Sequence, residues 1–189
     1  MKRLAGKIAK ALAGGPKRPH PGPPPDEAAP VDLLDRFTTA LERVAGRVVR
    51  VADEAAARKL ITAEFAENSV VFAEDHPAEA DLVAADVGVD RADLLLADTG
   101  TVLRSYPDRA ASRISLVPET SVFLAAAADV VPGYPEAFAA IADRHREGRA
   151  YSVLITGPSR TADIEKELVI PAHGPRELVV VVIESGGRA

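Results

Sequence analysis

The chain has 189 residues, 47% hydrophobic and 27% charged, which suits a soluble globular protein with one well-buried core. A formal net charge of -5 and 4% aromatic residues argue against nucleic-acid binding, which favours a basic face and stacking platforms. The lack of cysteine excludes a thiol nucleophile, a disulfide, and a cysteine-ligated zinc site or iron–sulfur cluster in this chain.

Residues 1–30 are predicted to form a basic, Pro-rich N-terminal arm, followed by a single α/β domain over residues 31–189. The first 25 residues contain six Lys or Arg and no acidic residue, and they end in a proline-rich run. The arm is expected to dock on its own body or on a partner, with a membrane-surface helix as the alternative. No apolar run approaches the roughly 20 residues of a membrane span. Lys7 and Lys10 interrupt any signal-peptide stretch, so we expect a cytoplasmic location.

From residue 31 onward, the hydrophobic pattern predicts alternating helices and strands. Leu34, Phe37 and Leu41 follow a helical spacing, with Asp32 as an N-terminal cap and Gly46 as a stop signal. A strand over 47–51 and a helix from Asp53 to about residue 67 follow. Further strands are expected at 70–73, 94–97, 101–103, 114–117 and 122–124, and a third helix at 135–147.

The apolar run over residues 178–183 is continuous rather than alternating, which indicates a strand covered on both faces, as in a parallel sheet. Helices mixed with such strands favour an α/β fold. We therefore expect three layers, a mostly parallel sheet flanked by helices, with some antiparallel hairpins among the short strands over 101–124.

The segment 155–165 carries the most informative motif. An apolar run breaks at Gly157-Pro158, and a helix start signal follows, which predicts a strand-to-helix turn with free backbone N–H groups. Such a turn can bind a carboxylate or phosphate, and Arg160 offers a bidentate fork. Alternatively, Ser159 or Thr161 simply caps the helix, while Asp163 satisfies its positive end. The pattern is neither a Walker loop nor a complete nucleophile elbow.

Two further blocks contain residues that can carry chemistry. Ala97-Asp98-Thr99-Gly100-Thr101 follows a strand and offers a carboxylate with two hydroxyls, although the same residues also suit an ordinary turn. His173-Gly174-Pro175 lies in the loop before the last strand, where a single His is more often structural than catalytic. The four histidines show no metal-ligand spacing, so we expect no metal site.

Together, these three blocks resemble the lactate utilization protein C family, also called the LUD domain, over residues 70–184. The resemblance implies a fold similar to that of ribose-phosphate isomerases, CoA transferases and formyltetrahydrofolate cyclo-ligase. It also implies a role in oxidising L-lactate to pyruvate with two iron–sulfur partner proteins. The chain departs from the family pattern at Asp98, where Glu is usual, and at Pro171, where Gly is usual.

These blocks define the expected site, a pocket for a small carboxylate or similar anion with no cofactor held by this chain. Asp98 and His173 are the acid–base candidates. The expected ligand-binding residues are Thr99, Gly100, Thr101, Gly157, Ser159, Arg160, Thr161 and Asp163. Two alternatives stay open: a stand-alone enzyme on a sugar-phosphate, acyl-CoA or folate-type substrate, and a non-catalytic scaffold or ligand sensor. Whether the chain itself catalyses a reaction is also open.

Overall fold

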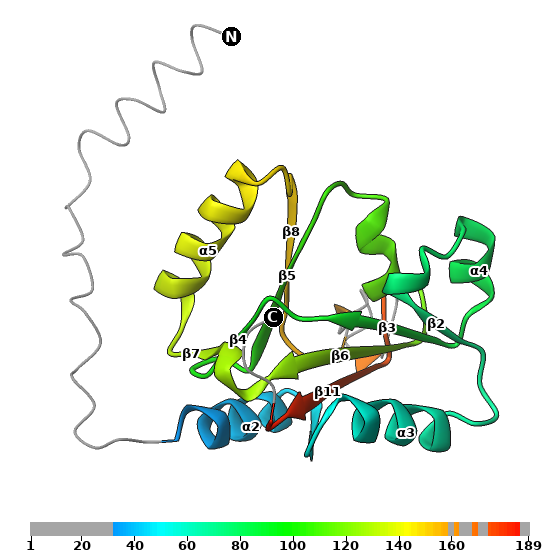
Figure 1. Cartoon of the computed structure of the whole chain (residues 1–189), viewed down its shortest axis with the longest axis horizontal. Coiled ribbons are helices and arrows are strands. Elements are labelled where there is room, and N and C mark those ends of the chain that lie inside the picture. The colour runs from blue at the N-terminus through cyan, green and yellow to red at the C-terminus, as the bar shows by residue number, and fades with distance from the viewer. Residues whose placement is uncertain (1–31, 159–160, 163–167, 170–173, 186–189) are drawn as a thin grey trace, which may run out of the picture. The chain divides into compact units, whose positions relative to one another are not determined.

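The computed structural model describes residues 32–158, 161–162, 168–169 and 174–185 (Figure 1). The predicted arm over residues 1–30 lies outside the described residues. The helices described are α2 (Leu33–Arg43), α3 (Glu54–Glu64), α4 (Glu79–Ala84) and α5 (Tyr134–Arg146), with 3-10 helices η1 (Ala73–Asp75), η2 (Ala111–Ser115) and η3 (Ala127–Asp129). In the described part of the chain, no helix is long and apolar enough to cross a membrane.

A five-stranded sheet forms the centre of the fold, and all its neighbouring strands run parallel. In spatial order it comprises β1 (Arg47–Val51), β11 (Glu177–Ile183), β6 (Thr120–Ala126), β3 (Val87–Arg91) and β2 (Val70–Phe72). β11 is buried on both faces, as its continuous apolar run predicts, because its alternate residues enter two separate cores.

A second sheet contains the antiparallel pairs. Its strand order is β7 (Val130–Val131), β4 (Leu94–Leu96), β5 (Thr101–Tyr106) and β8 (Tyr151–Ile155). β5 runs antiparallel to both β4 and β8, whereas β4 and β7 run parallel. The predicted α/β class, with a mostly parallel sheet flanked by helices and some antiparallel hairpins, is confirmed.

The two helices that flank the parallel sheet begin where the sequence predicts. Asp32 caps α2 by accepting a hydrogen bond from the Leu34 N–H at 2.9 Å, and Asp53 caps α3 by accepting one from the Ala56 N–H at 2.8 Å. α2 ends at Arg43, Ala45 just beyond it is left-handed, and the Gly46 N–H donates to the Leu41 carbonyl at 3.0 Å.

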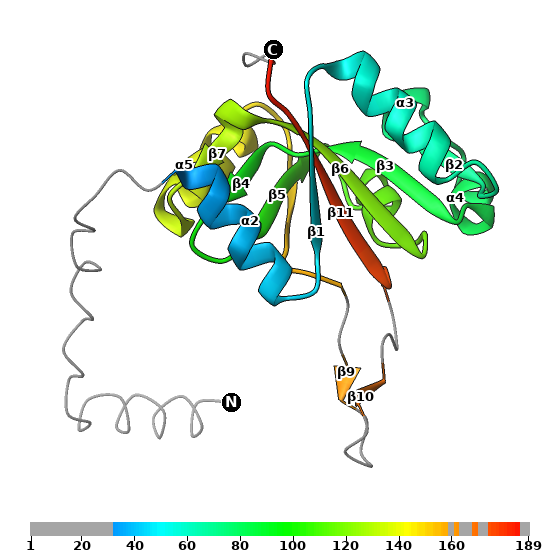
Figure 2. The same cartoon turned by 90° about the horizontal axis from the view of Figure 1, so that it is seen from below.

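The parallel sheet separates two cores (Figure 2). On one face, α2 and the second sheet cover residues such as Phe123 and Val180; on the other, α3 covers Val122 and Val181. A smaller core lies between the second sheet and α5, around Leu96 and Ala137. α2 is therefore held between two layers, and its C-terminal end reaches the blocks that the sequence singles out.

One expected strand is absent among the described residues, and several elements, including β3 and α4, were not predicted. Residues 114–117, expected as a strand, belong largely to η2 and the turn after it, where the Leu116 and Val117 N–H groups donate to the Arg113 carbonyl instead of to a neighbouring strand. β3 and α4 had no expected counterpart. In β3 a glycine and an aspartate interrupt the apolar pattern, which hides a strand that lies in the middle of the sheet.

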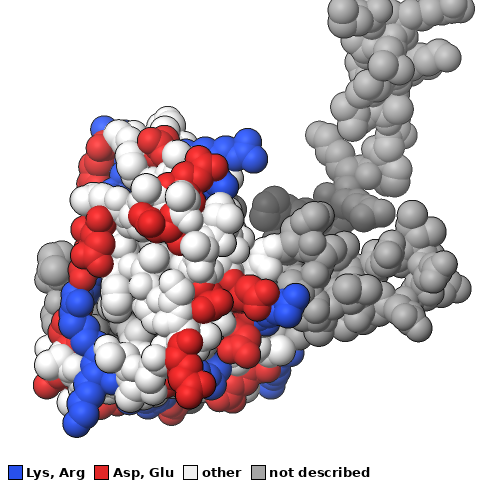
Figure 3. Space-filling view, turned by 90° about the vertical axis from the view of Figure 1, so that its right-hand side faces the viewer, with Lys and Arg blue, Asp and Glu red and all other residues white. Residues whose placement is uncertain are grey.

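The face that carries α4 and one end of α3 has acidic and basic side chains around a largely uncharged centre (Figure 3). Exposed ion pairs such as Arg58–Glu74 and Arg113–Glu79 join neighbouring elements in this part of the molecule. Ion pairs of this exposed kind contribute little to stability, about 0–1 kcal/mol each. The cores, rather than these pairs, hold the elements together.

Candidate functional site

A chain of three threonine hydroxyls joins two of the three blocks. β5 and β8 pair with Val102 opposite Ile155, which brings Thr101 at the start of β5 next to Thr156 just after β8. The Thr101 Oγ1 lies 2.7 Å from the Thr156 Oγ1 and 2.7 Å from the Thr99 Oγ1. Thr101 is fully buried. The antiparallel register therefore connects the 97–101 block with the 155–165 block.

The two predicted ligand-binding glycines in these blocks contact the end of α2. Gly100 and Gly157 both have positive φ angles, +67° and +77°. A side chain on Gly100 would collide with the Leu41 backbone, and one on Gly157 with the Val44 carbonyl oxygen. Glycine is needed at both positions because the helix backbone approaches a left-handed residue too closely for a Cβ. Packing alone accounts for both glycines.

A cavity of about 420 Å³ lies at the amino ends of β6 and β11 and is lined by residues of the 155–165 block and of the His173-Gly174-Pro175 block. We call it the amino-edge cavity. Its lining includes the hydroxyl-bearing residues Ser115, Ser121 and Thr156 and, among the described residues, no charged side chain. The remaining lining residues are Leu116, Val153, Leu154, Ile155, Gly157, Pro158, Gly174, Pro175 and Leu178.

Asp98 occupies a different position from the threonine hydroxyls. Its side chain is exposed and lies against Gly133, the residue that caps the N-terminus of α5, and its backbone N–H donates to the Pro132 carbonyl at 3.1 Å. A carboxylate beside a helix N-terminus is favoured by the positive end of the helix dipole. Asp98 does not line the amino-edge cavity. Its acid–base role stays a prediction.

The prediction that a helix follows Gly157 is wrong at Thr161, which lies in a strand. Thr161 and Ala162 form strand β9 (Thr161–Ala162), which pairs antiparallel with β10 (Leu168–Val169). A backbone in a strand ladder does not present the free N–H groups of a helix start, so the helix-dipole argument fails there. Ser159, Arg160, Asp163 and His173 lie outside the described residues, and their roles stay predictions.

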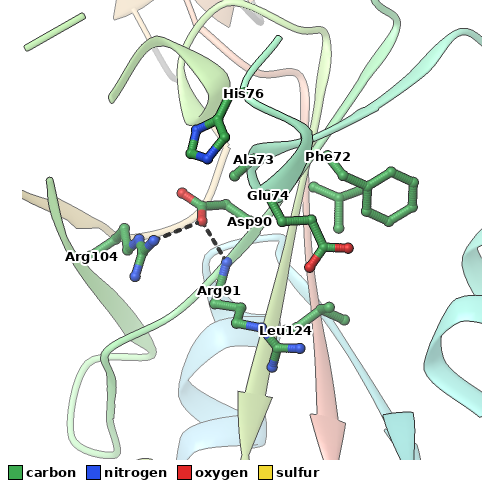
Figure 4. Close-up of a pocket in the computed structure, with 9 residues that line it drawn as sticks. Phe72, Ala73, Glu74, His76, Asp90, Arg91, Arg104 and Leu124 are labelled. Atoms are coloured by element: carbon green, nitrogen blue, oxygen red, sulfur yellow. Dashed lines mark hydrogen bonds and ion pairs between the residues drawn. The ribbon is translucent and has the colours of Figure 1, made fainter. Parts of the chain in front are cut away.

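A second cavity, of about 200 Å³, lies at the carboxyl ends of β2, β3 and β6 (Figure 4). We call it the carboxyl-edge cavity. Asp90, next to last in β3, is only 4% exposed and pairs with Arg104 of β5 at 3.2 Å. Burial raises the pKa of the Asp90 carboxyl above its usual 3.8, while the Arg104 guanidinium opposes the change.

The charges around the carboxyl-edge cavity continue into the second sheet. Arg104 also pairs with Asp93 at 3.4 Å, and Arg144 of α5 reaches Asp93 at 3.6 Å. Arg104 lies over the ring of Tyr106, and burial next to Asp90 raises the pKa of that phenol. The sequence patterns did not predict this cluster. Its one available signal was an aspartate inside the short apolar run over residues 87–90.

Among the described residues, no group of three or more His, Asp or Glu side chains is placed to hold a metal ion. The described side chains offer hydroxyls and backbone groups at the amino-edge cavity and charged groups at the carboxyl-edge cavity. The first suits a ligand held by hydrogen bonds. The second suits proton exchange or the binding of a polar group next to a buried carboxyl.

Comparison with known proteins places these features in a family. The LUD domain family matches residues 72–183. A lactate utilization protein C from Oceanobacillus iheyensis is 36% identical over 104 residues, covering 53% of this chain and 44% of that protein. One from Geobacillus sp. (strain WCH70) is 33% identical over 102 residues, covering 52% and 42%. The chain thus spans less than half the length of these curated relatives.

A solved structure supports the fold. The crystal structure of a DUF162 family protein from Deinococcus radiodurans is similar with a TM-score of 0.59 and 20% sequence identity, covering 83% of this chain and 99% of that one. Both cavities and the threonine chain fall largely inside the matched residues 72–183, which make up more than half of the sequence. The chain therefore belongs to the LUD domain family.

Proposed function

We propose that this protein acts in lactate utilization, as a subunit of an L-lactate-oxidising assembly whose iron–sulfur clusters are carried by partner proteins. The names of the curated relatives support the pathway. The absence of cysteine in this chain supports a division of labour in which cysteine-held clusters belong to other subunits.

Within that assembly, the amino-edge cavity binds a small carboxylate. The observation that carries this proposal is the 2.7 Å contact between Thr101 and Thr156, since it joins two of the family blocks at a cavity that the third block also lines. Hydroxyl groups are suitable donors to a carboxylate, and a cavity without a described acidic lining residue does not repel one. Arg160 is the proposed cationic partner and His173 the proposed acid–base residue. Asp98 does not line this cavity, so its proposed acid–base role would require a ligand that extends beyond it.

Reconstitution tests the pathway role. Lactate-dependent reduction of an electron acceptor is measured in a mixture of this protein with the iron–sulfur partner proteins, and again with this protein omitted. We expect the omission to lower the rate strongly. An unchanged rate would remove the proposal that this subunit takes part in lactate oxidation.

Calorimetric titration with sodium L-lactate tests the site. Arg160→Ala should weaken binding about tenfold or more, the usual cost of losing a charge-assisted hydrogen bond, with little change in the melting temperature. Arg109→Ala is the matched control, because Arg109 is exposed and lines neither cavity. Equal affinities for the two variants would place the carboxylate elsewhere, and a large loss of stability in Arg160→Ala with intact binding would favour a structural role.

A further inference from the structure

The carboxyl-edge cavity lies where open α/β sheets commonly bind ligands, at the carboxyl ends of parallel strands. Phe72 ends β2, Asp90 and Arg91 end β3, and Leu124 lies in the second half of β6. None of these residues belongs to the three family blocks, and none lines the amino-edge cavity. The carboxyl-edge cavity is therefore a separate place at which to look for a ligand.

Asp90 has an unused hydrogen-bonding atom at this cavity. Its Oδ1 accepts from the Arg91 N–H at 2.7 Å and pairs with Arg104. Its Oδ2 is buried and accepts no hydrogen bond from a described residue, since the neighbouring Tyr106 hydroxyl donates to the Ser115 Oγ at 2.9 Å instead. Figure 4 shows the second carboxylate oxygen pointing toward His76 and away from both bonded partners. A buried oxygen without a partner is costly, so native structures normally fill such a position.

Arg104 has a hydrogen-bond donor without a partner, where Asp90 has an acceptor without one. Its Nε–H is buried and donates to no described residue, although its two terminal nitrogens reach Asp90 and Asp93. The same ion pair thus leaves one acceptor and one donor unsatisfied. A hydroxyl group can both donate to a carboxylate and accept from a guanidinium N–H.

The remaining charges indicate that the ligand is neutral. Arg91 pairs with Glu54, Glu74 pairs with Arg58, and Arg104 pairs with Asp90, so each arginine and each carboxylate that lines the cavity has a partner of opposite charge. The walls contributed by Phe72, Val89 and Leu124 are apolar and suit a short carbon skeleton. A volume of about 200 Å³ corresponds to roughly six or seven water molecules, which matches a compound of a few carbon atoms.

His76 lines the cavity in a strained conformation. Its φ of +48° is left-handed, which is unfavourable for a residue with a side chain, and Figure 4 shows its ring directed toward Asp90. Strain of this kind is retained where the position of the side chain matters. His76 is also the one imidazole among the residues that line the cavity.

We propose that the carboxyl-edge cavity is a second ligand site, which binds a small neutral hydroxyl-bearing molecule with its hydroxyl on Asp90 and Arg104 and with His76 over it. The site is independent of the carboxylate site at the amino edge. The Asp90 Oδ2 accepts a hydrogen bond from the ligand hydroxyl, and the Arg104 Nε–H donates a hydrogen bond to the hydroxyl oxygen. The apolar wall excludes water from the other side of the ligand.

Nuclear magnetic resonance with 15N-arginine-labelled protein tests the proposal, using glycerol and ethylene glycol as probes. The Arg104 Nε–H and the Arg91 backbone N–H are expected to shift saturably with both probes. The dimethyl ether of ethylene glycol, which retains the oxygens but lacks O–H donors, should produce no saturable shift. A saturable response to the ether equal to that of the glycols would show that the hydroxyl is not recognised, and shifts that never saturate would show that the probes do not bind at a site. Either result would overturn the proposal.

Two variants identify the residues involved. Asp90→Asn should weaken glycol binding by about fivefold or more, and Asp108→Asn, an exposed carboxylate in a loop, is its control. His76→Gly relieves the left-handed strain, so it should raise the melting temperature while weakening binding. Unchanged affinity in a stabilised His76→Gly protein would contradict the role of His76. Because Arg160→Ala tests the proposed L-lactate site and Asp90→Asn tests the glycol site, either proposal can fail without the other.

Discussion

The two edges of the parallel sheet differ in what they carry: one has the sequence motifs of the family, and the other has buried polar atoms without hydrogen-bond partners. At the amino edge lie the blocks by which the family is recognised, yet the described lining is uncharged and its best-defined polar contacts join side chains to one another. At the carboxyl edge there is no such block, yet a buried carboxyl and a buried guanidinium each have an unpartnered atom. A motif therefore marks where the family's sequence is distinctive, which is not always where polar groups are left for a ligand.

Gly100 illustrates the amino edge. Its place in the 97–101 block suggests a ligand-binding turn, but the structure explains it by the approach of α2, whose Leu41 backbone occupies the space of a Cβ. The threonines on either side of it bond each other. Part of what makes this edge recognisable is therefore the requirement to dock a helix against two strands.

The largest expected effect comes from Gly100→Ala. The new Cβ meets the Leu41 backbone and the residue must keep a φ of +67°, so we expect a loss of about 3 kcal/mol in the free energy of unfolding, measured in urea. Gly148→Ala is the control, since Gly148 has a φ of +88° but open space around it. It should cost only about 1 kcal/mol. Equal losses would show that helix docking does not explain Gly100.

The next effect tests the threonine chain. Thr101→Val keeps the shape of a fully buried side chain but leaves the Thr99 and Thr156 hydroxyls without their shared partner. We expect a loss of about 1–2 kcal/mol on urea unfolding. The matched control is Thr39→Val on the exposed face of α2, where about 0.5 kcal/mol or less is expected. A loss in Thr101→Val no larger than in this control would mean that the hydroxyl chain does not stabilise the contact between blocks.

The smallest effect is a pH dependence at the carboxyl edge. Because burial raises the pKa of Asp90 above 3.8, the folded protein holds that proton more tightly than the unfolded chain does. The contribution of this carboxyl to stability therefore falls as pH rises from 3.8 to the folded pKa, and is constant above it. Each pH unit between the two pKa values contributes about 1.4 kcal/mol.

Asp90→Asn removes this dependence. The unfolding free energy of the variant minus that of the parent should rise with pH across the same window. The charged and titratable groups around Asp90 are Arg91, Arg104, Tyr106, Glu74 and His76. Both proteins therefore carry Glu74→Gln and His76→Ala, which remove the other carboxyl and the imidazole that line the cavity. A difference that stays flat from about pH 4 to pH 7 would show that Asp90 is ionised as easily as in the unfolded chain.

Most of the fold follows from local pattern. Helical spacing with Asp caps predicts α2 and α3, and the continuous apolar run predicts a buried parallel β11. β3 was not predicted because Gly88 and Asp90 break the apolar run, although the strand pairs with β2 on one side and β6 on the other. Pairing with neighbours decides that strand, and pairing is not encoded in a five-residue window.

The site was predictable to a smaller extent. The blocks indicate which segments meet, and the register of β5 with β8 shows how Thr101 comes to face Thr156. Thr161 and Ala162, expected in a helix after Gly157, form strand β9 instead, because pairing with β10 is stronger than the local signals for the start of a helix. The Asp90–Arg104 ion pair joins two sheets, so it cannot be predicted from any single segment of the sequence.

The most direct test of this account maps where L-lactate binds, by following backbone amide resonances during a titration with sodium L-lactate. We predict saturable shifts at Thr156, Gly157 and Gly174, which line the amino-edge cavity, with Arg91 and Leu124 of the carboxyl-edge cavity unchanged. Saturable shifts at Arg91 and Leu124 with none at the amino edge would contradict the assignment of the carboxylate site to the family blocks.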